Sequence, residues 1–341
     1  MGLKMRTVED VLSCMIEQEA SDLHLTPDEP AFLRKDGCLQ AVGILPAFSV
    51  ASWLGQQAGL VCRLQKAKED VDFSFSFQGR RLRGHAYLAG GKEALAFRLL
   101  PEHIPTFAKI GAPTGLAELA KARHGLILLT GRVGSGKSTT LAALLLALAE
   151  QRSLHCVTLE DPVEFIFHHM GSMFHQRELG RDFSAFDAAI RSTLREDPDV
   201  LLVSELRDRE TIRAALAAAE AGTLVLSTVH ARTAAEAPQR LADFFPAAEQ
   251  GPVRAALAAS LTAIVAERLV RVPSGRHAVY EVLLRTPAIC HMIRTAADHQ
   301  IPSAVLSGSR IGMTTFAQEG QRLLQAGVLT QQSVQELMGE G

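Results

Sequence analysis

The sequence has few cysteines and no long apolar run. Its five cysteines are Cys14, Cys38, Cys62, Cys156 and Cys290. They are scattered and form no C-x-x-C pair, which argues against a structural zinc site and predicts reduced, mostly buried thiols. The longest apolar run, residues 141–149, is too short to span a bilayer, and the first six residues lack the apolar core of a signal peptide. We therefore expect a cytoplasmic protein.

Neither sign of charge is in excess. The 35 lysines and arginines nearly balance 37 acidic residues, and no polybasic block occurs. This balance argues against a direct nucleic-acid partner, although a local basic channel in an oligomer would escape the test. Lysine is absent after Lys137, where arginine supplies the positive charge. A lysine kept amid this bias indicates a site that the larger, planar guanidinium does not fit.

The chain is long enough for two domains, since 341 residues exceed the usual size of one. Prolines at positions 101, 105 and 113 interrupt the pattern of helices and strands, so we place a linker at residues 101–113. The predicted domains are therefore residues 1–100 and residues 114–341.

Residues 1–100 predict a small α+β domain. Thr7 followed by Asp10 is typical of a capped helix start, and apolar residues then recur at helical spacing. Asp36 and Gly37 predict a hairpin turn, and phenylalanines alternate with polar residues at 72–77 as in a half-buried strand. Strands are expected at residues 21–25, 31–34, 39–42, 72–77, 81–87 and 94–99. This pattern favours helices set against an antiparallel sheet.

From residue 125 onward, short apolar segments alternate with helical patterns, which is typical of a parallel α/β core. Strands are expected at residues 125–130, 154–159, 200–203 and 223–228. After Ala231 the pattern is mostly helical, apart from a hairpin-like pair at residues 268–272 and 277–284.

Residues 131–138 carry the most specific motif of the chain. Their sequence, GRVGSGKS, matches G-x-x-x-x-G-K-[ST], the phosphate-binding loop of nucleoside triphosphatases. An apolar strand precedes this phosphate loop and a run of strong helix formers follows it, as the motif requires. Lys137 is expected to reach the β- and γ-phosphates, and the Ser138 hydroxyl to hold Mg²⁺. The expected ATP-binding residues are Gly131, Arg132, Val133, Gly134, Ser135, Gly136, Lys137, Ser138 and Thr139.

Polar and acidic residues follow the next three expected strands, at the end where parallel sheets bind ligands. Residues 160–164 contain several carboxylates, and Pro162 ends the strand. Glu205 follows the strand at 200–203 and predicts a carboxylate for Mg²⁺ or its waters. His230 follows the fourth strand. Each group alone is typical of a solvated strand end, but three in succession after a phosphate loop predict a site.

These segments resemble a known family, the hexameric ATPases of type II secretion and type IV pili, and more closely its pilus retraction branch. The resemblance is carried by TGRVGSGKSTTL, TLEDPVEF, REDPDVLLVSELRD and STVH. It extends over almost the whole chain through SDLHL near the N-terminus, HQRELGRD after the acidic segment and RIGMTT near the C-terminus. The tetracysteine insert that is usual in the extension and secretion members is absent.

The resemblance implies a RecA-like P-loop ATPase core preceded by a smaller PAS-like α+β domain. It implies Mg²⁺-dependent ATP hydrolysis in a homohexameric motor that docks on a pilus or secretion platform protein at the inner membrane. Glu164 would be the general base, Glu205 the Mg²⁺-side acid and His230 the sensor of the γ-phosphate. The candidates for arginines that reach a neighbour's nucleotide in trans are Arg81, Arg83 and Arg98. Each of these three is alternatively an ordinary surface arginine.

Three segments differ from the family pattern. Residues 221–223 read AGT where the family often has TGH, which predicts slow hydrolysis limited by Thr223. The alternative is that Thr223 merely starts a strand, where a β-branched residue is favoured. Residues 132–133 read RV where PT is usual, and residues 288–295 read AICHMIRT where the retraction branch usually has AIRNLIRE. Two alternative functions stay open. One is a weakly hydrolysing, nucleotide-binding regulatory ring subunit, which the changes at Ala221 and Thr223 favour. The other is a nucleic-acid translocase on the same core, which the charge balance opposes.

Overall fold

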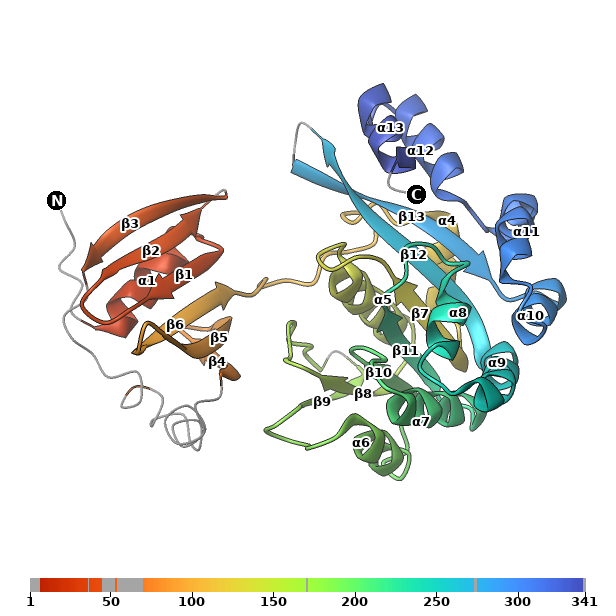
Figure 1. Cartoon of the computed structure of the whole chain (residues 1–341), viewed down its shortest axis with the longest axis horizontal. Coiled ribbons are helices and arrows are strands. Elements are labelled where there is room, and N and C mark those ends of the chain that lie inside the picture. The colour runs from red at the N-terminus through yellow and green to blue at the C-terminus, as the bar shows by residue number, and fades with distance from the viewer. Residues whose placement is uncertain are drawn as a thin grey trace. The chain divides into compact units, whose positions relative to one another are not determined.

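The computed structural model describes residues 7–35, 37–44, 53, 70–169, 171–272 and 275–339. The chain divides into two compact units, each with its own sheet and apolar core (Figure 1). The first unit contains Met1–His103 and the short segment Pro162–Ile166. The second contains Ile104–Asp161 and Phe167–Gly341. Nothing in the sequence pattern indicates that Pro162–Ile166 groups with the first unit.

The first unit is a six-stranded sheet in which neighbouring strands run antiparallel. Helix α1 (Val8–Glu17) begins at Thr7, which forms the expected capping box with Asp10. The strands are β1 (Asp22–Leu25), β2 (Pro30–Lys35), β3 (Cys38–Ile44), β4 (Val71–Phe77), β5 (Arg80–Ala89) and β6 (Lys92–Leu99), in the order β3-β2-β1-β6-β5-β4. This matches the expected α+β arrangement. The hairpin turn expected at Asp36 lies outside the described residues.

The core of the first unit is apolar. Helix α1 buries Val11, Leu12 and Met15, one face of a helix at the expected spacing. Phe73 and Phe75 are buried on β4, as their alternation predicts, and both pack within about 6 Å of the Trp53 ring centroid. The buried faces of α1 and β4 could therefore be predicted from the spacing of apolar residues in the sequence.

The second unit is built on a seven-stranded sheet. Its strands are β7 (Gly125–Thr130), β8 (His155–Glu160), β9 (Met173–Glu178), β10 (Val200–Val203), β11 (Leu224–Val229), β12 (Leu261–Val272) and β13 (Gly275–Leu284), in the order β13-β12-β7-β11-β10-β8-β9. All neighbours are parallel except β12 and β13. The expected parallel α/β core is confirmed. It brings the carboxyl ends of β7, β8, β10 and β11 to one edge of the sheet.

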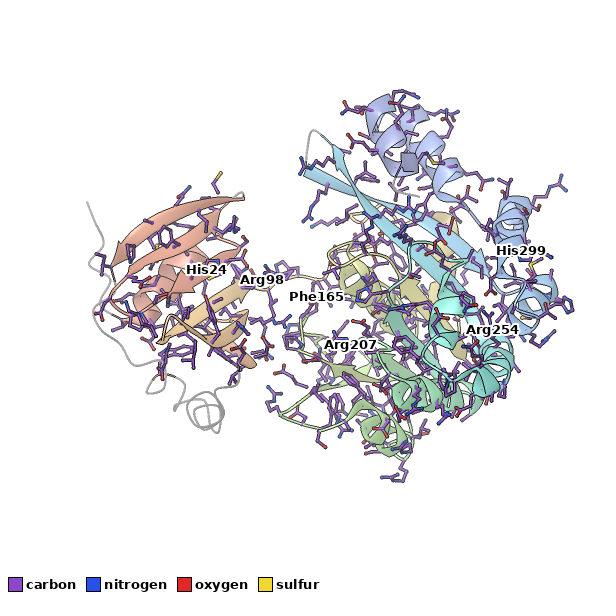
Figure 2. All side chains as sticks on the ribbon, viewed as in Figure 1. His24, Arg98, Phe165, Arg207, Arg254 and His299 are labelled. Carbon is purple, nitrogen blue, oxygen red and sulfur yellow. The ribbon has the colours of Figure 1, made fainter. Side chains whose placement is uncertain are left out.

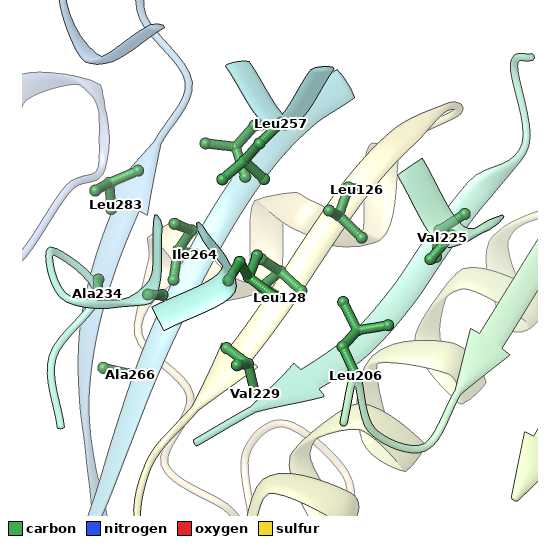
Figure 3. Close-up of a cluster of buried hydrophobic side chains, with 14 of the residues drawn as sticks. Leu126, Leu128, Leu206, Val225, Val229, Ala234, Leu257, Ile264, Ala266 and Leu283 are labelled. Carbon is green, nitrogen blue, oxygen red and sulfur yellow. The ribbon is translucent and has the colours of Figure 1, made fainter. Parts of the chain in front are cut away.

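Helices pack against this sheet. They are α4 (Thr114–Glu118), η2 (Leu119–Lys121), α5 (Lys137–Gln151), α6 (Phe186–Thr193), α7 (Arg209–Glu220), α8 (Ala237–Ala242), α9 (Ala247–Ser260), α10 (Pro287–Arg294), η3 (Asp298–Gln300), α11 (Ile301–Ser307), η4 (Gly308–Ile311), α12 (Phe316–Gln325) and α13 (Gln331–Gly339). Leu126 and Leu128 of β7 pack with Val225 of β11 and Leu257 of α9 (Figure 3). This continuous apolar layer holds β7, and hence the loop that follows it, in place.

Two strands correct the expectation from the sequence. The sequence does not indicate β9, because His175, Gln176 and Arg177 make it polar, as suits an outermost strand that pairs only with β8. β12 begins at Leu261, in a stretch expected to be helical. Residues 263–267 are all buried, so they lack the alternation of a half-buried strand and resemble a buried helix in sequence.

Among the described residues, no helix combines the length and apolar character that a membrane span requires. Cys14, Cys156 and Cys290 are buried free thiols, and Cys38 is exposed. Cys62 lies outside the described residues.

Candidate functional site

The phosphate loop joins the end of β7 to the start of α5. Two of its glycines are required by close approach. A Cβ at Gly131 would lie 2.5 Å from the Glu267 carbonyl oxygen, and one at Gly136 would lie 2.4 Å from Glu267 Oε1. Gly136, the N-cap of α5, also has a φ of +104°, a left-handed conformation that favours glycine. The loop is therefore packed tightly against β12.

Lys137 turns back into this loop. Its ammonium donates to the carbonyl oxygens of Gly131 at 3.0 Å and Arg132 at 2.8 Å, and the residue is only 9% exposed. Burial lowers the pKa of Lys137, while the nearby carboxyls of Glu205 and Glu267 oppose this shift. The buried Ser135 hydroxyl has no hydrogen-bond partner among the described residues. The loop thus holds a desolvated cation and a free hydroxyl, groups that an anionic ligand would satisfy.

Glu205 is held on both carboxylate oxygens. His230 Nε2 lies 3.0 Å from Oε1, and Arg207 Nε donates to Oε2 at 2.9 Å. The other ring nitrogen of His230 lies 3.3 Å from the Gly131 carbonyl oxygen. Arg207 (Figure 2), on the loop after β10, also lies 3.5 Å from Asp161 at the end of β8. The structure therefore brings together the residues that follow β7, β8, β10 and β11, as the sequence predicts.

The acidic residues after β8 differ in their surroundings. Glu160 is 8% exposed and accepts hydrogen bonds from Thr158 at 2.7 Å and Gln176 at 3.2 Å, so its carboxyl group is already hydrogen-bonded within the fold. Glu164 is partly exposed and belongs to Pro162–Ile166, the segment that groups with the first unit. The two glutamates thus occupy different structural units.

Two cavities flank the phosphate loop. One, of about 290 Å³, is lined by residues 131–135, Arg232, Glu267, Arg268, Leu269, Arg271 and Arg276. The other, of about 200 Å³, is lined by Lys109, Ile110, Gly136, Thr139, Thr140, Glu267, Leu269, Arg276, His277, Ala278 and Tyr280. The first is rich in arginine, which suits an anionic ligand. The sequence expectation missed Glu267, the acidic residue that lines both cavities; its signal is a lone acid after the apolar run 263–266.

A family model described as "Type II/IV secretion system protein" matches residues 91–337. The chain belongs to this family. The expected resemblance to the ATPases of type II secretion and type IV pili is thereby confirmed.

Relatives of known sequence match this chain over nearly its whole length. An uncharacterised protein of Escherichia coli, YggR, is 42% identical over 338 residues, which cover 98% of this chain and 99% of the relative. The type IV pilus retraction ATPase PilT of Pseudomonas aeruginosa is 36% identical over 339 residues, which cover 96% of this chain and 97% of PilT. The crystal structure of the pilus retraction motor PilT with bound ADP has a TM-score of 0.86 at 36% identity, over 97% of this chain and 96% of that one.

The arginines considered for a trans role lie on the first unit of this family member. Arg83 lies 3.5 Å from Asp72, and Arg98 donates to Asp22 at 2.8 Å. Arg81 donates to the Ser74 hydroxyl. Each therefore has a local partner that it would have to exchange to reach a phosphate.

Thr223 lies next to the start of its strand, as the alternative interpretation expects, and not beside the phosphate loop. It precedes β11, whose first residue, Leu224, pairs with Gly125 at the start of β7, whereas the phosphate loop follows the end of β7. The six residues of β11 span about 20 Å, so Thr223 lies at the opposite edge of the sheet from His230. Its amide donates to the carbonyl of Ala218, which closes the end of α7. The expectation that Thr223 limits phosphate chemistry in its own subunit is therefore wrong.

Proposed function

We propose that this chain is the subunit of a homohexameric, Mg²⁺-dependent motor ATPase with a RecA-like core, which retracts a type IV pilus. Support comes from the family and from similarity over nearly the whole chain to PilT, whose similar structure holds ADP. We further propose that the motor works in the cytoplasm and docks on a platform protein at the inner membrane.

The observation that carries the proposal is the shape and charge of the phosphate loop. Gly131 and Gly136 leave no room for side chains on the β12 side. Lys137 donates to carbonyl oxygens of the loop itself, and among the described residues the Ser135 hydroxyl has no hydrogen-bond partner. These groups fit a polyphosphate, because backbone N–H groups at a helix N-terminus and a lysine ammonium bind phosphate oxygens. Residues 131–139 would hold ATP, with Lys137 exchanging carbonyl oxygens for phosphate oxygens.

Ser138 and Glu205 are the residues that would hold Mg²⁺. A hydroxyl at the start of α5 and a carboxylate at the end of β10 are the oxygen donors that this ion takes in phosphate-loop proteins. Bound Mg²⁺ would neutralise the negative charge of the phosphates. Arg207 and His230 fix the Glu205 carboxylate through its two oxygens, so its orientation is set before any ion arrives.

Glu164 is proposed to orient the attacking water as general base, and His230 to respond to the γ-phosphate. A water-orienting carboxylate acts mainly in the transition state, so its loss would slow hydrolysis more than it weakens binding. Arg81, Arg83 and Arg98 are proposed to supply positive charge to a neighbouring subunit's nucleotide. Glu164 and these arginines all belong to the first unit.

The test is steady-state ATP hydrolysis by the full chain across protein concentration, with ring assembly followed by light scattering. The proposal predicts hydrolysis that requires Mg²⁺ and rises per chain as rings form. Bound nucleotide without turnover in assembled rings would instead support a regulatory ring subunit. A rate that depends on added DNA would support a translocase. Rapid turnover by the monomer would contradict the ring motor.

A further inference from the structure

Glu267 lies between the two cavities and against the phosphate loop. It is on β12, is 2% exposed, and packs so closely on Gly136 that a methyl group there would overlap its carboxyl group. Its Oε2 has no hydrogen-bond partner among the described residues. An ionised carboxylate in such a place is strongly disfavoured, whereas a neutral carboxylic acid is tolerated far better.

A chain of hydrogen bonds runs from Glu267 to the predicted linker. Glu267 bonds to Thr140 on α5, the Thr140 hydroxyl lies 3.2 Å from the Tyr280 hydroxyl, and Tyr280 donates to the Ile110 carbonyl oxygen at 3.3 Å. Burial raises the pKa of Tyr280, so its hydroxyl keeps its proton.

The proton count in this chain points to the state of Glu267. Each hydroxyl brings one proton, but the chain contains three hydrogen bonds. Because Tyr280 donates to Ile110, the single proton of Thr140 can be donated either to Tyr280 or to Glu267. If Glu267 is ionised, Thr140 donates to it and the contact between Thr140 and Tyr280 lacks a proton. A protonated Glu267 supplies the third proton and completes all three hydrogen bonds.

Charged groups from several elements surround Glu267. Lys137 faces it from α5, with Glu205 beyond. Of the two cavities that Glu267 lines, one is also lined by Lys109, Arg276 and His277, and the other by Arg132, Arg232, Arg271 and Arg276. Arg268, next in sequence, is engaged elsewhere: it donates to the Leu337 carbonyl and lies 4.3 Å from the Phe316 ring centroid. Burial raises the pKa of Glu267 to about 8, although Thr140 and Lys137 oppose this shift. The surroundings thus leave Glu267 largely neutral near pH 7.

We propose that Glu267 is a positioning residue that must carry its proton for the phosphate loop to bind nucleotide. The inference rests on the proposed nucleotide site. An ionised Glu267 would repel the phosphates, attract Lys137 away from them, and lose its donated hydrogen bond to Thr140. Each effect weakens binding, so nucleotide binding favours the protonated form.

The sign of the pH dependence follows. Because nucleotide binding favours the protonated form of Glu267, nucleotide affinity falls as pH rises through the pKa of Glu267, near 8. Without nucleotide, the folded-state pKa of Glu267 is raised above its unfolded value. The folded chain therefore binds more protons than the unfolded chain, and its stability falls as pH rises from the unfolded pKa toward about 8.

The experiment measures the Kd of a fluorescent ADP analogue for the full chain from about pH 6.5 to about pH 9.5. In Glu267→Gln, the amide donates to Thr140 at every pH and carries no charge, so tight binding should persist. Over this range the native Kd should rise about tenfold more than that of Glu267→Gln, since one linked proton changes Kd about tenfold per pH unit above the pKa.

Glu281→Gln is the matched control. Glu281 lies on the same hairpin, and burial raises its pKa, but it accepts from the Ala234 amide and lines neither cavity. This variant should keep the native pH dependence. Equal pH dependence in the native chain and Glu267→Gln would overturn the inference, as would weak binding by Glu267→Gln at every pH. If the native chain binds no nucleotide at any pH, the proposed function fails and the inference falls with it.

Discussion

The two units of the chain treat polar side chains in opposite ways. Among the described residues, every buried polar or charged side chain lies in the second unit. In the first unit the charged groups pair at the surface: Lys92 with Glu29, and Arg98 with Asp22. The second unit buries Lys137 and Glu267 beside the phosphate loop. Burying such groups costs free energy, so their concentration at one edge of a sheet indicates a binding site rather than a stabilising device.

The residues that stabilise each unit differ from those expected to bind nucleotide. The apolar core of the first unit explains its fold without any buried charge. In the second unit, Leu126 and Leu128 belong to the apolar core that holds the sheet, whereas Lys137, Glu205 and His230 at its carboxyl edge do not. Variants at that edge should therefore change function with little change in folding, and the following predictions use that difference.

The largest effect is expected from Lys137→Ala. Removing the buried ammonium takes away charge from the phosphate site, and hydrolysis should fall about a thousandfold or more, with weaker nucleotide binding and near-native thermal stability. Lys92→Ala, which removes an exposed lysine of the first unit, is the control and should hydrolyse ATP at the native rate. A native rate in Lys137→Ala would refute the phosphate-loop assignment.

The next effect concerns stability. Arg254, on α9, is 4% exposed and donates to both Asp298 carboxylate oxygens, at 3.0 and 2.7 Å (Figure 2). Arg254→Ala leaves Asp298 without its partner and should lower the free energy of unfolding by about 3 kcal/mol. Arg98→Ala breaks an exposed pair and should lower it by about 1 kcal/mol or less. Urea unfolding followed by circular dichroism compares the two; equal losses would contradict the contrast drawn between the units.

A smaller effect is expected from Glu205 of the second unit and Glu164 of the first, which should differ in how their loss changes the Mg²⁺ requirement. Glu205→Gln should slow hydrolysis about ten- to a hundredfold and raise the Mg²⁺ concentration needed for half-maximal rate. Glu164→Gln should slow hydrolysis at least as much while ATP stays bound, with an unchanged Mg²⁺ requirement. The measurement is initial rate against Mg²⁺ at fixed ATP. A shared shift in Mg²⁺ requirement would assign both residues to the ion.

The smallest effect is expected at Thr223. Since Thr223 lies at the edge of the sheet opposite the phosphate loop, Thr223→His should leave kcat within about twofold of the native value under matched ring assembly. Steady-state kinetics checks this. A tenfold rise in kcat would show that this residue acts on hydrolysis, which the position of β11 within one subunit does not explain.

The sequence predicted the parts of the second unit that depend on local signals. A strand, a glycine loop and a helix are adjacent in sequence, so the conformation around Lys137 was predictable, as was the gathering of Glu205 and His230 at the carboxyl ends of parallel strands. The phosphate role expected for Thr223 was wrong because it came from the departure from the family pattern, whereas the expected strand at residues 223–228 already separates Thr223 from His230. Glu267 was missed because its contacts with Gly136 and Thr140 join residues more than a hundred positions apart.

The most direct test of the account is hydrogen–deuterium exchange of the full-length Glu164→Gln chain, with and without Mg²⁺ and ATP. This variant is expected to hydrolyse ATP slowly, so that bound ATP persists during the exchange. The account predicts that nucleotide slows exchange at the amides of residues 133–139 and at those of Glu205 and His230. In the sheet of the first unit, amides that lie outside subunit contacts should exchange at the same rate with and without nucleotide. Unchanged exchange at residues 133–139 under saturating nucleotide would contradict the claim that the carboxyl edge of the second unit is the nucleotide site.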